Sequence, residues 1–587
     1  MRRRPLVLPL LVSLCLLSAL SAGARVAEGT MGSTRAVGDT LTTVMRPILS
    51  VPVIIEDGQS FTIEAKASTG TTGWSATLRR GGLSYSLPLS DISYESSRQR
   101  WFMTATVAPG TPEELYDLHV QASGGVDDVT KHSVMVEDSI SNDFYFIHIT
   151  DTHLITHLFY DDPGSAADTT EIDDLRAVID DINIINPAFV LLTGDVINEG
   201  ELEEFENRRY FTKTKRLLGE FEVPVFLGAG NHDVGGWDST PPPDGTARRN
   251  WWKFFGWRWL YDPPTGEDIY TQNYFFEYGH AHFISLESYV NYDDWRHYRY
   301  GDVSFTTKQM AWLEDHLSSV HPVKAVILFY HMDFDDEIDL DDLGVDGAVY
   351  GHIHRDSGAI GAAPFNIATD NVCDGSRAMR LFRVSDNVVT PTETIKAGGG
   401  HGYNLRVTYD AANDGTETDI EATVINGQSE SFEHARLKFH VPAASMPYAV
   451  DGGTVTHSIV DGSIATYYVH VDLDAMSGAT VSISPETGVV DTPVSTLALV
   501  RPLSPNPARA GSSLRYALGT PAHVTAEVFD VSGRLVRTLR SDWTKAGEHL
   551  LSWNLTDDSG HRVSSGSYFF RVTANGNALS DKVIVLR

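Results

Sequence analysis

Apolar and polar residues follow two kinds of pattern along this chain. Residues 45–138 contain short runs with a period of two, such as FTIEA, WFMTATV and LYDLHV, separated by Gly and Pro turns. This pattern predicts a small β-sandwich. Similar runs return in LRVTYD, IEATVI, RLKFHV and YYVHVDL, so we expect a β-rich domain over residues 397–492.

The region between these two, residues 143–396, alternates apolar strands with helical patterns. Thr170 is placed to cap a helix whose apolar residues recur at helical spacing, and Asn186-Pro187 ends that pattern. The strand AFVLLT follows at once. This alternation predicts an α/β domain in the middle of an otherwise all-β chain.

The amino-terminal end has the three parts of a secretory signal peptide. Arg2, Arg3 and Arg4 precede an apolar run that ends at Leu20, and Ala22-Gly23-Ala24 follows. We therefore expect a signal peptide over residues 1–24 and a secreted, periplasmic or cell-surface bacterial protein. No later run reaches the roughly 18 apolar residues of a transmembrane segment. Removal of the signal peptide leaves Cys373 as the only cysteine, so the exported chain has no internal disulfide.

The charge of the chain limits its partners. The formal net charge is −33, which repels nucleic acids and anionic membranes. We expect no nucleic-acid polymer as a partner. An anionic substrate would need a strong local cationic site.

Five apolar strands of the middle domain end in side chains that can bind metal ions. In open α/β sheets the loops at the carboxyl ends of the strands converge on a ligand-binding crevice. Carboxylate, imidazole and amide donors without thiolate suit divalent ions such as Mn, Fe, Co, Ni or Zn, and disfavour a structural zinc site. The seven candidates are Asp151, His153, Asp195, Asn231, His331, His352 and His354. Seven ligands suffice for two ions if Asp195 bridges them.

The order of these motifs resembles the calcineurin-like metallophosphoesterase family. The motifs are D-x-H, GD, GNHD, a lone His after a strand, and GHxH, and the resemblance spans roughly residues 145–390. It implies a central α/β metallophosphoesterase β-sandwich flanked by helices. The resulting prediction is a multidomain chain with one small all-β (immunoglobulin-like) domain before this sandwich and two after it.

The resemblance also implies roles for the site residues. Asp151, His153, Asp195 and His354 would hold the first ion, and Asp195, Asn231, His331 and His352 the second. A hydroxide between the ions would attack phosphorus in line. His232 would protonate the leaving oxygen or steady its charge, and Asp233 would orient that imidazole.

Several other stretches also contain residues that could form a functional site. Gly279-His280-Ala281-His282 repeats GHxH but lies in a turn before His331, which favours a structural role. His157 is interpreted as a solvated loop histidine rather than a cleft residue. The acidic run from Asp333 to Gly347 lacks the ligand spacing of a calcium loop and predicts a solvated rim. The aromatic and basic run from Arg248 to Tyr261 fits equally a lid over the substrate and a hydrophobic mini-core.

The resemblance leaves three functions open. We favour a phosphodiesterase acting on a small phosphoester, because FIHITDTHL and GDVINEG look like bacterial cyclic-nucleotide phosphodiesterases of the superfamily. A phosphomonoesterase or nucleotidase is the second hypothesis, and a non-catalytic surface adhesin or scaffold is the third. Asp195 is followed by Val196-Ile197-Asn198, without the Tyr of purple acid phosphatases, so we expect a colourless enzyme.

The last segment, residues 503–587, has a resemblance of its own. A linker rich in Pro and Ser leads into SPNPARAGSSLRYAL, AEVFDVSGRLVRTL and SGSYFFRV. These runs resemble the FlgD-type immunoglobulin-like tails of exported bacterial proteins, some of which are sorting signals. The tail implies attachment to the cell surface or contact with export machinery.

Overall fold

The structure is a computed structural model of the whole chain. It describes residues 42–586 except 97–98, 155–166, 199–203, 235–245, 256–271, 289–303, 306, 322, 335, 399–404, 487–496, 510, 519–521, 546 and 575–576. The signal peptide predicted for residues 1–24 lies outside these residues. None of the described helices combines the length and the apolar character that a membrane span requires.

Two sheets form a β-sandwich from the amino-terminal residues. The first has the order β1-β3-β7-β6, with strands Val44–Arg46, Ser60–Ala65, Arg100–Thr106 and Leu89–Glu95. The second has the order β2-β9-β8-β4-β5, with strands Val53–Glu56, Val126–Glu137, Glu114–Ala122, Ser75–Arg80 and Leu83–Leu87. Alternate residues of these strands face one apolar core, which includes Ile63, Leu78 and Leu118.

A buried carboxyl group lies where the β-sandwich contacts the central domain. Tyr278 donates a hydrogen bond of 2.8 Å to Glu137 at the end of β9. Burial raises the pKa of Glu137 to about 8, and the carboxylates of Glu113 and Glu56 add to the rise. Glu137 therefore stays protonated in the folded protein at neutral pH.

This protonation predicts the stability of the Glu137→Gln variant. In the unfolded chain Glu137 ionises near its usual pKa of roughly 4.3, so the folded state loses relative stability as pH rises from there to about 8. The neutral amide removes this loss. We expect equal thermal stability of variant and wild type at pH 4, and a variant more stable by on the order of 1–3 kcal/mol at pH 8. Thermal unfolding at both pH values checks this, and a variant less stable at pH 8 would contradict it.

The central domain contains two five-stranded sheets. One has the order β12-β11-β10-β18-β19, with strands Val225–Leu227, Val190–Leu192, Asp143–Ile149, Ala378–Ser385 and Val388–Lys396. The other has the order β13-β14-β15-β16-β17, with strands Tyr274–Tyr278, Ala281–Ser285, Ala325–Phe329, Gly347–Tyr350 and Phe365–Ala368. In the first sheet β10, β11 and β12 are parallel, whereas β18 pairs antiparallel with both β10 and β19. In the second sheet β14 to β17 are parallel and β13 is antiparallel to β14.

Aromatic side chains fill the space between the two sheets. Phe146 stacks on Phe189 and on Phe382 of its own sheet, and contacts Phe283 of the opposite sheet edge to face. Phenylalanine buries a large apolar area, so this layer supplies much of the energy that joins the sheets.

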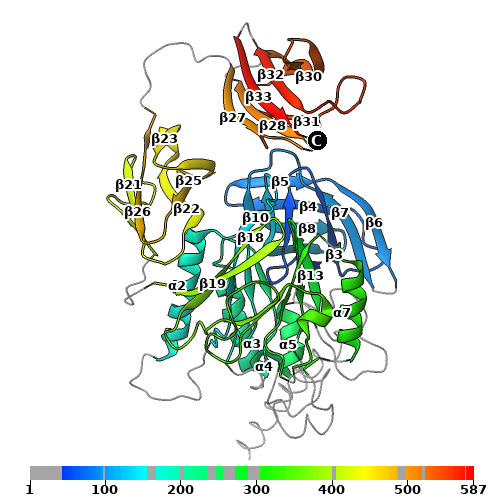
Figure 1. Ribbon diagram of the computed structural model, residues 1–587, viewed down its shortest axis with the longest axis vertical. Coiled ribbons are helices and arrows are strands. Elements are labelled where there is room, and N and C mark those ends of the chain that lie inside the picture. Colours follow the sequence, from blue (N-terminus) through cyan, green and yellow to red (C-terminus); the bar gives the residue numbers. More distant parts are fainter. Residues whose placement is uncertain are drawn as a thin grey trace, which may run out of the picture. The chain divides into compact units, whose positions relative to one another are not determined.

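Helices cover the outer faces of the two sheets (Figure 1). One face packs against α2, α3 and α5, which span Ala167–Ile185, Glu204–Leu218 and Thr246–Phe255. The other packs against α7, Thr307–Ser319, through residues such as Leu313. Two short helices, α4 at Asn231–Val234 and α8 at Leu340–Leu343, follow strand ends. The result is the predicted β-sandwich flanked by helices, so the fold class is confirmed.

Helix α2 shows how local signals and structure agree and differ. It begins at Ala167, so Thr170 lies inside the helix and not at its cap. Its end matches the prediction, because Asn186 takes a left-handed conformation with φ 57° ahead of Pro187. Apolar residues on one side of α2, including Leu175 and Ile182, are fully buried.

The described residues after β19 are all β, apart from the short 3-10 helix Ala443–Ser445. One sheet has the order β20-β21-β26-β23, with strands Leu405–Tyr409, Ile420–Asn426, Ser477–Pro485 and Tyr448–Asp451. A second has the order β22-β25-β24, with strands Phe432–Pro442, Ile464–Leu473 and Thr454–Asp461. These sheets belong to the same compact unit as the central domain. That unit extends to Ser484.

A second compact unit contains residues 485–587 together with Ala108–Thr111. It has one sheet of order β27-β28-β31, with strands Leu497–Ser504, Ser512–Leu518 and Gly547–Trp553. The other has the order β30-β29-β32-β33, with strands Leu535–Thr544, Ala522–Asp530, Gly566–Ala574 and Asn577–Val585. Trp553 packs against Tyr568 and Phe570 in its core. The boundaries given above for the individual domains remain predictions.

Candidate metal centre

The predicted ligands follow the carboxyl ends of five strands. β10, β11 and β12 are parallel neighbours in one sheet, and β15 and β16 are parallel neighbours in the other. Because parallel strands end at one edge of a sheet, the loops that follow them converge there. The structure accordingly brings together side chains that are up to about two hundred residues apart in the sequence, such as His153 and His354.

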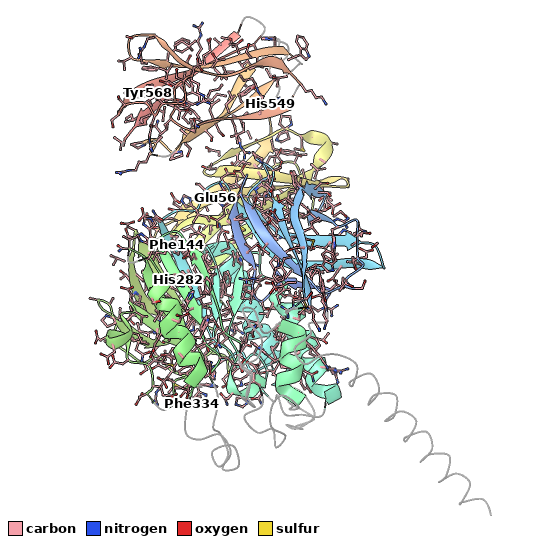
Figure 2. All side chains as sticks on the ribbon, turned by 90° about the vertical axis from the view of Figure 1, so that its right-hand side faces the viewer. Glu56, Phe144, His282, Phe334, His549 and Tyr568 are labelled. Atoms are coloured by element: carbon pink, nitrogen blue, oxygen red, sulfur yellow. The ribbon has the colours of Figure 1, made fainter. Side chains whose placement is uncertain are left out.

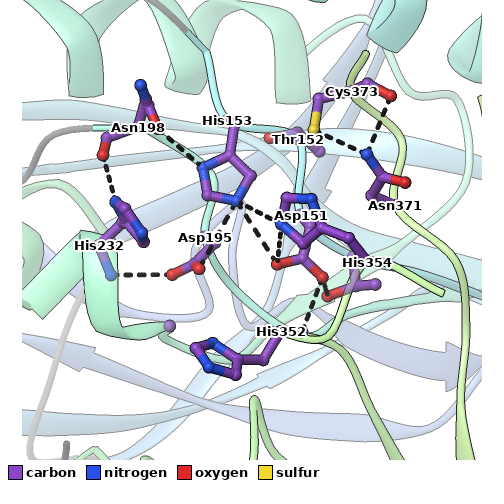
Figure 3. Close-up of polar contacts among 12 residues, drawn as sticks. Asp151, Thr152, His153, Asp195, Asn198, His232, His352, His354, Asn371 and Cys373 are labelled. Carbon is purple, nitrogen blue, oxygen red and sulfur yellow. Dashed lines mark hydrogen bonds and ion pairs between the residues drawn. The ribbon is translucent and has the colours of Figure 1, made fainter. Parts of the chain in front are cut away.

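The ligand atoms form overlapping groups in which all atoms lie within 4.8 Å of one another. One group is Asp151, His153 and His354; a second is His153, Asp195 and His232; a third is Asp195, His331 and His352. His153 and Asp195 each belong to two groups, and Asp195 is the carboxylate that lies between the first group and the third, as a bridging ligand would. Figure 3 shows Asp195 between His232 on one side and His153 on the other.

The carboxylate of Asp195 has contacts on both oxygens. Its Oδ2 lies 3.0 Å from Nε2 of His331 and 3.7 Å from Nε2 of His153. Its Oδ1 accepts a hydrogen bond of 2.9 Å from the backbone N–H of His232. The side chain is almost fully buried, so its orientation is set by these neighbours.

Pairs of imidazole nitrogens approach one another closely in this centre. Nε2 of His153 lies 3.1 Å from Nε2 of His354, and Nε2 of His331 lies 3.2 Å from Nδ1 of His352. The amide oxygen of Asn231 lies 3.0 Å from the same Nδ1 of His352. Converging lone pairs of this kind can share a proton or bind a common cation.

Outer hydrogen bonds fix which nitrogen faces the centre. Nδ1–H of His331 donates to the backbone oxygen of Thr193 at 2.8 Å, and Nδ1–H of His153 donates to Oδ1 of Asn198 at 3.2 Å. In the neutral form of each imidazole, this bond places the lone pair on Nε2. Metal-binding histidines are oriented by such contacts in general.

One buried oxygen supports the fit of a cation. Oδ1 of Asp151 has no hydrogen-bond partner among the described residues and lies 3.6 Å from Nε2 of His153 and 3.5 Å from Nε2 of His354. A buried carboxylate oxygen without a donor is costly unless a cation is close to it. The carboxylate, imidazole and amide donors therefore fit divalent metal ions.

The backbone of the ligands carries strain. Asp151, His153, Asp195, His352 and His354 all have positive φ, between 40° and 69°. Non-glycine residues rarely adopt this conformation, and when they do they cluster at functional sites. Gly230 contributes space, because a Cβ there would collide with the carboxylate and backbone of Asp195.

The ionisable side chains of the centre differ in how their pKa values are shifted. Burial would raise the pKa of Asp195, but the neighbouring His331 lowers it below its usual value. Burial alone would lower the pKa of His331, but Asp195 raises it to about 9. Burial and the nearby His331 lower the pKa of His352 to about 4. The centre thus keeps its carboxylates ionised, as cation binding requires.

His232 and Asp233 lie at the beginning of α4, but their partners differ from the expectation. Nδ1–H of His232 donates to the backbone oxygen of Asn198 (Figure 3). Asp233 instead accepts hydrogen bonds from the backbone N–H groups of Val196, Ile197 and Gly230. Asp233 therefore joins the loops after β11 and β12, and the imidazole of His232 is oriented by Asn198.

Asn198 is a site residue that the sequence analysis missed. It contacts both His153 and His232, but no motif in the sequence marks it, and it is simply the third residue after Asp195. The parallel bridge between Leu154 and Ile197 places the two loops side by side. Cys373 was missed as well: it is buried, its backbone N–H donates to Asp151, and its sulfur lies in a donor group with His354 and Asp374.

Asn198→Ala tests this outer contact. Loss of the amide oxygen frees Nδ1 of His153, so we expect metal affinity to fall about tenfold while the backbone contact to His232 stays. Metal content at limiting free Mn²⁺ measures the effect. Asn183→Ala, which removes a comparable amide on α2, is the matched control. Equal metal content in all three proteins would contradict the role of Asn198.

The competing stretches lie apart from the centre or outside the described residues. His280 pairs with Asp386, and His282 contacts Glu277 and His316, so neither histidine of the second GHxH joins the seven ligands. His157 lies outside the described residues. The described acidic residues after Asp333 form no donor group with a metal-binding geometry. In the aromatic run, the described Trp251, Phe254 and Phe255 are buried against Phe211, which favours the mini-core for this part.

Comparison with known proteins identifies two parts of the chain. Residues 144–356 match the family described as calcineurin-like phosphoesterase, and residues 507–578 match the FlgD Ig-like domain. No curated protein matches the chain. Both resemblances noted in the sequence are thereby confirmed.

Solved structures are similar to parts of the chain at low identity. A dimetal phosphatase from Danio rerio is 15% identical over 43% of this chain and 98% of its own, with a TM-score of 0.32. A purple acid phosphatase from yellow lupin (Lupinus luteus) seeds is 11% identical over 63% of this chain and 70% of its own, with a TM-score of 0.34. FlgD from P. aeruginosa is 17% identical over 15% of this chain and 74% of its own, with a TM-score of 0.12.

Proposed function

We propose that this chain, whose central domain is a calcineurin-like phosphoesterase and hence a phosphoester hydrolase, is an exported phosphodiesterase with two divalent transition-metal ions. Asp151, His153, Asp195 and His354 hold the first ion in this proposal, and Asp195, Asn231, His331 and His352 hold the second. The single observation that carries it is the chain of three overlapping donor groups, in which His153 links the first group to the second and Asp195 links the second to the third. Bound ions of this kind lower the pKa of a water and neutralise phosphoryl oxygens.

His232 and Asp233 have separate roles in this proposal. His232 holds one proton on Nδ1 against the backbone oxygen of Asn198, so Nε2 is the atom that carries the transferable proton. A protonated imidazole there stabilises the charge that develops on the leaving oxygen, or protonates it. Asp233 keeps the backbone of the loop in place through three N–H groups.

The surroundings of the centre favour a diester over a monoester. The carboxylate of Asp374 is exposed and lies in a donor group with His354. Asp333 and Asp336 lie close enough to Tyr330 to contribute to its raised pKa. Added negative charge repels a phosphomonoester dianion more than a singly charged diester. The natural substrate in this proposal is therefore a small phosphodiester met outside the cell.

A substrate comparison tests the proposal. The mature protein is loaded with Mn²⁺ and assayed with bis-p-nitrophenyl phosphate and p-nitrophenyl phosphate. We expect kcat/KM for the diester to be at least about tenfold higher, activity to disappear on chelation, and added Mn²⁺ to restore it. Preference for the monoester would favour a nucleotidase. Folded protein that is inactive with every common divalent metal would favour the scaffold.

Export is supported by the two ends of the chain. The first 24 residues have the pattern of a signal peptide, and the FlgD Ig-like segment lies near the other end. Fractionation of cells that express the full chain tests this part. Recovery of the full-length protein in the cytoplasm alone would overturn it.

A further inference from the structure

Two histidines meet on the outer side of the second sheet, remote from the candidate metal centre. His282 is the second residue of β14 and is 2% exposed, and His316 is a half-buried residue of α7. β14 runs parallel to β15, whose carboxyl end leads to His331, so His282 lies toward the opposite edge of the sheet. In Figure 2, His282 is well separated from Phe334, whose ring contacts His352 in the centre.

The two imidazoles point reactive nitrogens at each other. Nε2 of His282 lies 2.9 Å from Nε2 of His316. The corresponding separations in the candidate metal centre are 3.1 Å for His153 and His354 and 3.2 Å for His331 and His352. Two imidazoles bound to one tetrahedral ion at roughly 2.0–2.1 Å each have their nitrogens roughly 3.3 Å apart. The two nitrogens of the pair are therefore slightly closer than this, as they are in the candidate metal centre, and binding of one cation requires only a small separation of the rings.

A carboxylate fixes the tautomer of the first histidine. Glu277 lies directly across from His282 in the antiparallel pair of β13 and β14. Its Oε1 accepts a hydrogen bond of 3.1 Å from Nδ1–H of His282, which leaves the lone pair on Nε2. The other oxygen of Glu277 lies 2.5 Å from Nζ of Lys324. A carboxylate on the remote nitrogen is the arrangement that orients histidines on metal ions.

Aromatic rings enclose the pair. Phe275 stacks against His282 with centroids 5.3 Å apart and contacts His316 at 4.1 Å, while Trp312 stacks on His316 at 5.4 Å. Burial lowers the pKa of both His282 and His316, so both are neutral at pH 7. Neutral imidazole is the form that binds metals.

We propose that His282 and His316 bind one Zn²⁺ ion as a second metal site, separate from the candidate dinuclear centre, with water in the remaining positions. In the described part of the chain, no third His, Cys, Asp or Glu donor joins these two. Two imidazoles suit borderline ions such as Zn²⁺. The ion would tie α7 to β14 and stabilise the packing of the helix on the sheet.

Zinc content of matched variants tests the site. Wild type, His316→Gln and His280→Gln are equilibrated with the same buffered free Zn²⁺, and bound metal is measured per chain. His280 lies in the same hairpin but pairs with Asp386, so it is the control. Wild type and His280→Gln should retain about one more zinc ion than His316→Gln, and their thermal transition should rise further with Zn²⁺. The candidate dinuclear centre is intact in all three, so the difference isolates the second site.

A second measurement tests the site in the wild-type protein, without any substitution. Anomalous diffraction at the zinc edge from wild-type crystals should give a peak between the rings of His282 and His316. Equal zinc content in the three proteins, or the absence of that peak at saturating Zn²⁺, would overturn the proposal. Circular dichroism verifies that His316→Gln is folded.

Discussion

Asp195→Asn is expected to lower kcat/KM by at least about a hundredfold. The carboxylate faces His331 at 3.0 Å and His153 at 3.7 Å and belongs to two donor groups. The amide keeps the size of the side chain and its hydrogen bond from His232 but removes the negative charge. The variant should therefore fold and yet hold fewer ions. Diesterase kinetics and metal content, measured on the same preparations, check both parts.

A buried carboxyl group on α2 provides the matched control. Asp181 is buried, accepts a hydrogen bond from the N–H of Gly398, and has its pKa raised to about 7 by burial. Asp181→Asn should leave activity within about threefold of wild type, since the amide keeps the size of the side chain and Asp181 belongs to none of the donor groups. Full activity and full metal content in Asp195→Asn would contradict the proposal that Asp195 bridges the two ions.

His232→Gln is expected to lower kcat by about 10²–10⁴-fold with little change in metal content. The imidazole lies in a donor group with His153 and Asp195, and its Nδ1 is held by Asn198. Glutamine can accept and donate hydrogen bonds but cannot transfer a proton at neutral pH. Turnover should therefore fall while the seven ligands stay in place.

The leaving group distinguishes proton transfer from a structural effect. p-Nitrophenolate leaves without protonation, whereas an alkoxide leaving group needs a proton in the transition state. We expect His232→Gln to lose far more activity with an alkyl phosphodiester than with bis-p-nitrophenyl phosphate. A uniform loss with both substrates, accompanied by loss of metal, would make His232 a ligand instead of an acid.

Much of the fold followed from local patterns because those patterns are set by short-range geometry. Period-two runs predicted the strands, and helical spacing with Asn186-Pro187 predicted the end of α2. The beginning of α2 was misjudged, since Thr170 lies inside the helix. A polar residue can cap a helix or lie within its first turns, and the choice depends on residues that precede it.

Most residues of the candidate centre could also be predicted from the sequence, for a different reason. Ligands that follow parallel strands must converge, because the sheet holds the strand ends at one edge. Residue types and order were therefore enough to predict the seven ligands. The contacts of Asn198, Asp233 and Cys373 could not be predicted from the sequence. Most of these contacts involve backbone N–H or C=O groups, which nearly every residue type has.

The sequence by itself determined the strand ends, the donor chemistry and the family resemblance of the central and last segments, all of which depend on residue identity and local order. Only the tertiary structure decided which nitrogen of each histidine faces the centre, which group orients His232, and that His282 meets His316. These pairs are 34 or more residues apart, and packing of helices on sheets sets their distances. Side-chain direction across such separations depends on the whole fold and leaves no periodic signal in the sequence.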